Sequence, residues 1–418
     1  MPATVDKMDA ANASSWVSRS PERISGPLTL AAMLVALVTV NSPLRPLYDA
    51  IHHTPVGIRV GGWDIERPLI LWINEGLMVF FFLLVALEIK REVLQGHLAS
   101  RARVALPLIS AVGGMVVPAV MYLAFTWRDP AAARGWPIPM ATDTVLALAA
   151  LRALGARVPA AVVAFLTATA IFDDLGAIAV LALLFSQSIS TPALLAAAAA
   201  GLGLALINRL GVTRLSAYLL GGLALWAAVL ASGVHATVAG FVIGLAVPLR
   251  SRRPERSPLL ALERGLKPWV ALVIVPVFAL FNAGIRIVDM APGTVVAGVV
   301  AGTALALALG KPAGILATAW VAVRSGLAQL PSGASWRHVA GAAVLAGIGF
   351  TMSLFFAGLA FGPREAMASS ATLGVLIGSL LSAVWGLAFL AFVTRRGRRR
   401  SVPASSQPAA AAATEDRR

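Results

Sequence analysis

Asp173 and Asp174 stand side by side in an apolar stretch that runs from about Val158 to about Leu184. A helix rises about 1.5 Å per residue, so this stretch is long enough to cross a lipid bilayer. On insertion-based scales an aspartate at the centre of such a helix costs about 2.5–3.5 kcal/mol. Carboxylates this costly usually serve an ion pathway or a proton relay, because a buried carboxylate can hold either a cation or a proton.

Of the other ionisable residues in apolar stretches, Glu75, Glu88 and His235 have ordinary interfacial or structural interpretations, whereas Asp143 in MATDTVLAL and Lys311 in LALGKPAGIL do not. The helical rise places Asp143 about 14 Å and Asp173 about 22 Å from the turn that separates their two stretches. An unpaired lysine inside a membrane would be neutral or strongly destabilising, so Lys311 should face a carboxylate. Neighbours on a helix point about 100° apart, so the adjacent aspartates cannot share this lysine equally. We therefore expect one of them to face Lys311 and the other to face a cavity with Asp143.

The composition is that of a membrane protein with many spanning helices. Of the 418 residues, 58% are hydrophobic and 13% are charged, and the mean hydropathy is +0.83. A soluble domain of this length would aggregate with such a composition. The absence of cysteine excludes disulfides, thiolate metal sites and thiol nucleophiles. The net charge of +15 does not indicate nucleic-acid binding, because the basic residues lie in short segments between apolar stretches, without interleaved aromatic residues.

About twelve apolar stretches have the length of a complete or broken membrane span. They cover residues 27–42, 68–88, 104–126, 138–152, 158–184, 192–208, 215–231, 234–248, 260–284, 295–323, 338–361 and 368–394. With alternate connections on opposite sides, about 23 basic residues fall on the side of the N-terminus and about 7 on the other. Because basic residues are enriched in cytoplasmic connections, we expect a multi-pass protein with both termini in the cytoplasm.

The two ends of the chain differ from the rest in composition. Residues 1–25 are mostly small and polar, and residues 395–418 begin with a basic cluster and continue with alanine, serine and proline. Such segments cannot bury enough apolar surface to fold. We therefore expect a transmembrane domain over 26–394 between two disordered cytoplasmic tails, 1–25 and 395–418.

Two of the apolar stretches contain residues that interrupt a helix. The prolines of GWPIPM come just before Thr142 and Asp143, and the glycines of AGIGF lie in the middle of the stretch 338–361. Interrupted helices in corresponding positions of two halves indicate the ion site of a transporter, because helix ends and unwound carbonyls can coordinate or balance charge. We expect Asp143 to offset the positive ends of these broken helices.

Between the first two stretches, VGIRVGGWDIER alternates around Gly61-Gly62. This pattern favours a tight β-hairpin, because two glycines supply the backbone angles of its turn. We expect a small extracytoplasmic hairpin over residues 57–66. Its exposed edge can pair with the same edge of a second copy, which would give a homodimer.

Six stretches resemble the bacterial NhaA-type sodium/proton antiporters. They are LWINEGLMVFFFLLVALEIKREVLQG, MATDTVLALAALRALG, IFDDLGAIAV, SGVHATVAG, LGKPAGI and AGIGFTMSLFFAGLAF, and with them the resemblance runs from about Gly26 to about Val393. The resemblance implies an all-α polytopic fold of twelve transmembrane helices in inverted-topology repeats, with helices four and eleven broken and crossing at the midplane. It also implies a homodimer in the bacterial cytoplasmic (inner) membrane.

The same resemblance assigns roles to individual residues. It implies that Asp173 and Asp174 bind sodium or lithium ions and carry protons, with Asp143 and Thr142 at the same site. Lys311 matches the lysine that pairs with the first aspartate. Residues matching those implicated in pH response at a cytoplasmic funnel are Glu88, Arg91, Glu92 and Glu263. Arg264 and Lys267 stand where better-known members of that family carry histidines, and unlike histidines they keep their charge between about pH 6 and 8.

These residues indicate a secondary active transporter that exchanges Na+ or Li+ for H+, without a cofactor and without enzymatic activity. A sodium ion needs deprotonated oxygen ligands, so protons and the ion exclude one another at the same coupled carboxylates. A second acid beside the one that faces Lys311 lets unequal charge move in each cycle, so we expect electrogenic exchange. The resemblance implies a role in pH and sodium homeostasis.

Three other functions remain open from the residues alone. A cation-coupled solute symporter would need a second, larger site for an organic substrate. An intramembrane aspartyl protease would need two carboxylates that share a proton, which Lys311 would suppress, and no GxGD stretch occurs here. A channel would also carry charged residues inside the membrane, but proton-labile groups at a closed midplane suit a carrier better.

Overall fold

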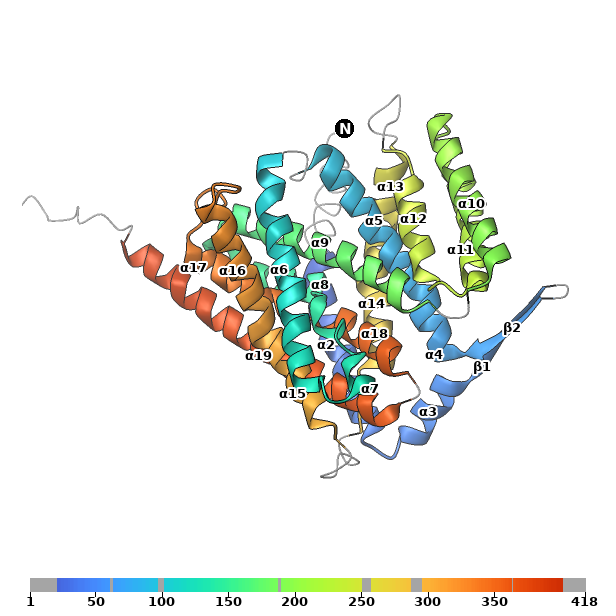
Figure 1. Ribbon diagram of the computed structural model, residues 1–418, viewed down its shortest axis with the longest axis horizontal. Helices are drawn as coiled ribbons and strands as arrows, with labels where there is room; N and C mark the ends of the chain where they lie inside the picture. The colour runs from blue at the N-terminus through green and yellow to red at the C-terminus, as the bar shows by residue number, and fades with distance from the viewer. Residues whose placement is uncertain are drawn as a thin grey trace, which may run out of the picture.

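The protein is built almost entirely of helices, as its computed structural model shows (Figure 1). The structure describes residues 21–60, 63–96, 101–186, 189–249, 257–286, 295–362 and 364–400. In its first half the elements are α2 (Pro21–Val40), α3 (Arg45–His53), β1 (Pro55–Val60), β2 (Trp63–Pro68), α4 (Leu69–Leu71), η1 (Trp72–Leu77), α5 (Met78–Gln95), α6 (Arg101–Thr126), α7 (Pro130–Ala133), η3 (Ile138–Met140), α8 (Thr144–Ala153), η4 (Gly155–Arg157) and α9 (Ala160–Leu184). In the second half they are α10 (Thr191–Arg209), α11 (Leu215–Ser232), α12 (Thr237–Ala246), α13 (Pro258–Trp269), η6 (Val270–Ile274), α14 (Val275–Asn282), α15 (Ala297–Leu305), η7 (Ala306–Gly310), α16 (Lys311–Arg324), α17 (Trp336–Ala346), α18 (Phe350–Phe361) and α19 (Glu365–Arg400).

Each apolar stretch predicted from the sequence overlaps a helix. Among the described residues, eight helices are long and apolar enough to span a membrane, and two bent pairs bring this number to ten. The bent pairs are α2 with α3, at 111°, and α17 with α18, at 42°. The shorter helices α8 and α12 are also apolar. The predicted class, an all-α polytopic membrane protein, is confirmed.

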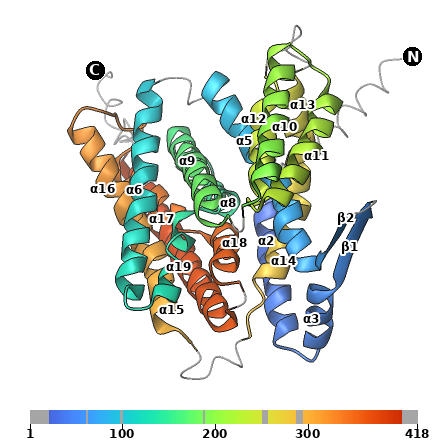
Figure 2. The same cartoon turned by 45° about the vertical axis from the view of Figure 1, so that its right-hand side comes forward.

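The predicted hairpin is present as the antiparallel pair β1 and β2, which projects from the helices (Figure 2). Pro55 lies opposite Pro68, and Val60 lies opposite Trp63. The two glycines predicted to form its turn lie outside the described residues.

Two contacts fix the base of the hairpin to the start of the following span. Trp72 Nε1 donates a hydrogen bond of 2.9 Å to Val56 O, and Arg67 forms a 2.8 Å ion pair with Glu75. Trp72 and Glu75 both belong to η1, a π-helical segment that leads into α5. The hairpin is therefore anchored to a membrane span and not only to its own connecting loops.

The predicted tails lie mostly outside the described residues. Residues 1–20 and 401–418 are not described. Within the described part, α2 already begins at Pro21 and α19 continues to Arg400, so helix extends a few residues past both boundaries predicted for the transmembrane domain.

The helices pack around two clusters of buried apolar residues that meet at α5. The larger cluster joins α5 to α8, α9 and α14–α18, and the smaller joins it to α10–α13. Phe82 and Val85 of α5 belong to the larger cluster, whereas Leu83 and Leu87 belong to the smaller. Helices α10–α13 accordingly stand as a group beside the remaining helices (Figure 2). Asp173 and Lys311 lie on elements of the larger cluster, whereas Glu263 lies on α13 in the smaller one.

Helices α6 and α16 touch through their backbones at a pair of glycines. A Cβ atom added to Gly113 would lie 2.4 Å from Gly314 O, and one added to Gly314 would lie 2.1 Å from Gly113 O. Any side chain at either position would therefore push the two helices apart. This close approach holds α16, which begins with Lys311, against α6.

Candidate functional site

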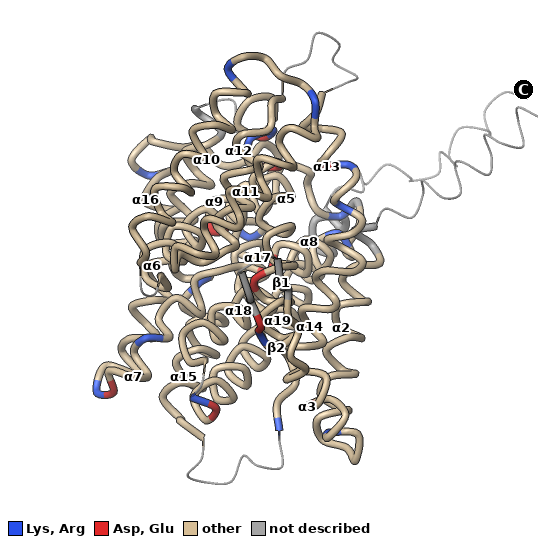
Figure 3. Tube along the Cα trace, turned by 90° about the vertical axis from the view of Figure 1, so that its right-hand side faces the viewer, with Lys and Arg blue, Asp and Glu red and all other residues tan. Residues whose placement is uncertain are grey.

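Charged residues lie mainly toward two ends of the molecule, and a few lie between them (Figure 3). The side chains of Asp173, on α9, and Lys311, on α16, are fully buried. Asp173 Oδ2 lies 3.0 Å from Lys311 Nζ. The ammonium also donates a hydrogen bond to Met140 O, at the end of η3. The structure therefore places the lysine between a carboxylate and the negative end of a broken helix.

Thr142 joins this pair to the second broken helix. Its Oγ1 lies 2.7 Å from Asp173 Oδ2 and 3.0 Å from Ala346 O, the last residue of α17. The single hydroxyl proton is therefore shared between a carboxylate and a carbonyl group at the C-terminal end of a helix. Thr142, Asp173 and Lys311 form one cluster, and the expectation that one aspartate of the pair faces Lys311 agrees with it.

Two carboxylate oxygens of the aspartate pair lack a partner. Asp173 Oδ1 and Asp174 Oδ1 are buried and accept no hydrogen bond from any residue that the structure describes. Asp174 is 3% exposed. Unpartnered oxygens of this kind are unfavourable in a protein interior, because burial removes their hydrogen bonds to water and no protein hydrogen bond replaces them. A proton or a small cation would satisfy them.

A cavity of about 360 Å³ lies along the face of α9 that carries Asp174. It is lined by Glu92 and Arg152 and by α9 residues that include Ala160, Val163, Thr167 and Ile171. Asp174 follows Ile171 by three residues and Thr167 by seven, so the three side chains lie on one side of the helix. Asp173 is turned about 100° away, toward Lys311. The two adjacent aspartates thus face different surroundings, as their spacing predicts.

Asp143 connects the two broken spans. It is the N-cap of α8, where its Oδ1 accepts a hydrogen bond of 2.9 Å from Leu146 N. Its Oδ2 accepts hydrogen bonds from Thr351 N, at 3.1 Å, and from Thr351 Oγ1, at 2.6 Å. Its own N–H donates to Ile348 O at 2.7 Å. One carboxylate therefore caps the positive ends of both α8 and α18, which agrees with the expectation that it offsets these ends.

We expected Asp143 and one aspartate of the pair to face a common cavity. Asp143 is not among the residues that line the cavity along α9. Both oxygens of Asp143 are engaged by the ends of α8 and α18. Within the described ranges, no three residues of the types His, Cys, Asp and Glu converge on a common point as metal ligands would. A role for Asp143 as a direct ion ligand stays a prediction, and its observed contacts are structural.

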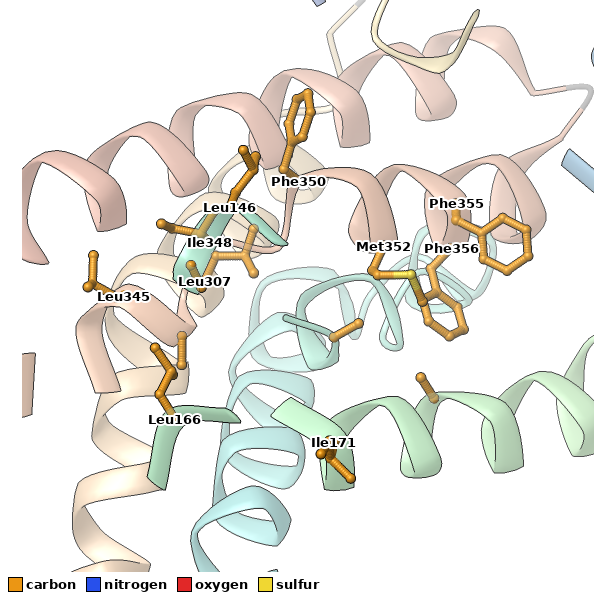
Figure 4. Packing of buried hydrophobic residues seen from close by; sticks show 14 of the residues in the cluster. Leu146, Leu166, Ile171, Leu307, Leu345, Ile348, Phe350, Met352, Phe355 and Phe356 are labelled. Carbon is orange, nitrogen blue, oxygen red and sulfur yellow. The ribbon is translucent and has the colours of Figure 1, made fainter. Parts of the chain in front are cut away.

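The break between α17 and α18 is enclosed by apolar side chains. Leu307, Leu345, Ile348 and Phe350 are buried around it (Figure 4). Gly347 allows the backbone of η7 to approach, since an added Cβ would lie 2.4 Å from Leu307 O. The polar contacts of Asp143 and Thr142 therefore lie in surroundings of low polarity, where each is stronger than it would be in water.

The residues predicted to respond to pH form two groups of ion pairs. Arg91 Nε lies 3.0 and 3.1 Å from the two carboxylate oxygens of Glu263, and Arg91 Nη1 lies 2.9 Å from Glu92 Oε1. Lys267 Nζ lies 3.5 Å from Glu88 Oε1. Glu92 also lines the cavity along α9. The structure therefore joins Arg91, Glu92 and Glu263 in one group, of which Glu92 reaches the cavity, and pairs Glu88 with Lys267.

Several contacts of the site were not predicted from the sequence. The sequence does not identify Thr351 as the partner of Asp143, and the carbonyl groups of Met140 and Ala346 carry no sequence signal. The ion pair of Arg67 with Glu75 was also missed. A basic residue on the strand that leads into a span containing an acid is a signal that could have suggested it.

The chain is similar to known proteins over most of its length. The sequence model of the family described as "Na+/H+ antiporter 1" matches residues 18–390. The chain is 49% identical over 376 residues to "Na(+)/H(+) antiporter NhaA 1" of Pseudomonas putida, which covers 90% of this chain and 95% of that protein. It is 48% identical over 375 residues to "Na(+)/H(+) antiporter NhaA" of Shewanella loihica, with 90% and 96% covered.

Proposed function

This chain belongs to the Na+/H+ antiporter 1 family and exchanges sodium ions for protons across a membrane, and we propose that the two ions compete for Asp173 and Asp174. One observation carries this assignment. The two acids are buried, Asp173 lies beside the ends of two broken helices, and each acid has a carboxylate oxygen without a partner among the described residues. Sodium prefers anionic oxygen ligands, and the same oxygens bind protons.

Asp174 is the group that we expect to exchange with the cavity. It lies on the same side of α9 as Thr167 and Ile171, which line the cavity, and one helical turn beyond Ile171. The hydroxyl of Thr142 contacts Asp173 and supplies a further oxygen close to the pair. We expect sodium or lithium to bind between these oxygens when the carboxylates are deprotonated, and to leave when they are protonated.

Lys311 balances the charge of Asp173 whether or not an ion is bound. Because the ammonium is within 3.0 Å of Asp173 and also donates to Met140 O, the charge that changes in each cycle is carried mainly by Asp174 and the ion. More than one proton exchanged for each sodium ion would make the transport electrogenic, and both pH and sodium homeostasis would follow from it. Asp143 stays engaged by α8 and α18 and keeps their ends neutralised.

The membrane topology that we propose has twelve crossings in inverted-topology repeats. The eight long helices, the two bent pairs and the shorter helices α8 and α12 supply this number. The breaks at residues 141–143 and 347–349 take corresponding positions, one in each half of the chain. The distribution of basic residues supports a bacterial inner-membrane protein with both termini, and the tails 1–25 and 395–418, in the cytoplasm.

The competition can be tested by titrating exchange with sodium at several pH values. Arginine and lysine, which stand at positions 264 and 267, do not titrate near neutral pH as histidine does. We therefore expect the net charge around the ion pairs of Glu88, Arg91 and Glu263 to change little with pH in this range. The apparent affinity for sodium should then fall smoothly as protons are added, while the maximal rate at saturating sodium stays nearly constant. Histidine at positions 264 and 267 should make the maximal rate depend on pH. A steep loss of maximal rate in the unmodified protein at saturating sodium would show that a separate pH switch exists.

The hairpin is the surface through which we expect two copies to form a homodimer. The segment 57–66 spans the outer part of β1 and β2, whereas Val56, Arg67 and Trp72, which anchor the hairpin, lie outside it. Deleting 57–66 should therefore weaken the dimer and leave exchange measurable. The dimer fraction can be followed by size-exclusion chromatography at falling protein concentration. Migration as an undiminished dimer would place the contact elsewhere.

A further inference from the structure

Two π-helical segments of the described chain are each followed by one residue and then a proline. The segment η6, with sequence VALVI, is followed by Val275 and Pro276, and η7, with sequence ALALG, is followed by Lys311 and Pro312. In both cases the residue before the proline donates its backbone N–H to the carbonyl group five residues earlier, Val275 to Val270 O and Lys311 to Ala306 O. A regular α-helix would use the carbonyl group four residues earlier.

The proline explains why the helix widens at these points. Proline has no N–H, and in a regular α-helix its ring collides with the carbonyl group four residues before it. A π turn inserts one residue and relieves this collision, and such turns often occur at functional sites. The third π segment, η1, is not followed by a proline, so its cause is different.

The segment η7 determines which way Lys311 points. Lys311 is the first residue after the π turn, and its ammonium group contacts both Asp173 and Met140 O. Each residue of a helix adds about 100° of rotation about the helix axis. If the π turn became a regular α-helical turn, the residues on one side of it, Lys311 among them, would rotate relative to those on the other side. In a packed interior the Lys311 side chain could not change its conformation enough to keep its contact with Asp173 after such a rotation.

The surroundings of η7 leave it little freedom. A Cβ added to Gly310 would lie 3.1 Å from Pro118 Cα of α6, and Leu307 O closely approaches Gly347 at the break of the other span. Leu307 and Lys311 are both fully buried. The π turn is thus held between α6 and the break, and its form is coupled to the position of the Lys311 ammonium.

We infer that Pro312 is a positioning residue: it keeps Ala306–Gly310 in the π form and so directs the Lys311 ammonium to Asp173. The inference rests on the proposed role of Lys311 at the ion site. Its control lies in the same chain, because Pro276 follows η6 in the same way but adjoins no buried ion pair that the structure describes.

The test is a thermal double-mutant cycle on the full-length protein in detergent. Pro312→Ala and Pro276→Ala are each introduced into the native background and into a background in which Lys311→Met and Asp173→Asn remove the ion pair. Alanine restores the missing N–H and favours the regular α-helix. We expect Pro312→Ala to lower the melting temperature by several degrees in the native background only, because the relaxed helix separates Lys311 from Asp173. Pro276→Ala should shift the melting temperature equally in both backgrounds.

Equal shifts for Pro312→Ala in the two backgrounds would overturn the inference. If Pro312→Ala prevents insertion, Pro312→Gly, which also restores the N–H, takes its place. Insertion of these variants only in the background without the ion pair would support the coupling, and failure in both backgrounds would show that the proline is needed for folding and not for positioning. Because melting is measured without ion exchange, either result leaves the ion-exchange mechanism to be judged separately by the Asp174 variant.

Discussion

The Asp174→Asn variant is expected to insert into the membrane at normal levels and to lose sodium-dependent exchange completely. Asp174 is 3% exposed, and its Oδ1 accepts no hydrogen bond from the described residues. Asparagine has nearly the same shape and no charge, so it is easier to bury, but it can neither release a proton nor supply an anionic ligand. Fluorescence dequenching on sodium addition to everted membrane vesicles measures the exchange directly.

The matched control is Asp129→Asn, the same substitution at the N-cap of α7. Asp129 accepts hydrogen bonds from Ala131 N and Ala132 N, which an asparagine oxygen can also accept. This variant should exchange at the rate of the unmodified protein. Retained sodium-dependent dequenching in Asp174→Asn, at an expression level equal to that of the control, would refute the assignment of the ion site.

The second large effect is on stability. Replacing Lys311 with methionine leaves Asp173 buried without its partner, and breaking a buried ion pair from one side typically costs about 3–5 kcal/mol. Asp173 would keep only its contact with Thr142, and Met140 O would lose its donor. We expect a large fall in the melting temperature in detergent. Adding Asp173→Asn should recover a large part of this loss, because it removes the uncompensated charge.

The control for this prediction is the same substitution at a partly exposed ion pair. Lys267 pairs with Glu88 at 3.5 Å, and the two side chains are 36% and 29% exposed. Solvent-exposed ion pairs contribute at most about 1 kcal/mol, so Lys267→Met should change the melting temperature little. Equal losses for the two variants would mean that the Lys311 pair is not desolvated as its burial indicates.

Much of the fold followed from patterns of hydrophobicity and from residues that interrupt helices. Each predicted apolar stretch coincides with a helix or a broken helix, because a long apolar segment has few alternatives to a helix in a membrane. The alternating residues on either side of Gly61-Gly62 predicted a hairpin, and β1 and β2 form that antiparallel pair. The cluster of Asp173 with Lys311 was predictable, because a buried charge requires a partner.

The remaining contacts of the site depend on how distant elements pack. Asp143 could be expected near the break, but its contact with Thr351, 208 residues later in the chain, depends on how the N-terminal ends of α8 and α18 meet. The π turn before Lys311 could not be predicted from Pro312 alone, since proline also kinks or ends helices. Backbone acceptors such as Met140 O are provided by every residue type, so no sequence pattern distinguishes them.

The contact between Gly113 and Gly314 limits which amino-acid substitutions this protein can accept during evolution. A substitution that enlarges a residue in a packed core can often be compensated by a second one that shrinks its neighbour. Here each glycine faces the backbone of the other, and neither position has a side chain left to remove. Enlarging one of them therefore has no compensating change at the other. Helix α16, which begins with Lys311, can therefore stay this close to α6 only as long as both glycines persist.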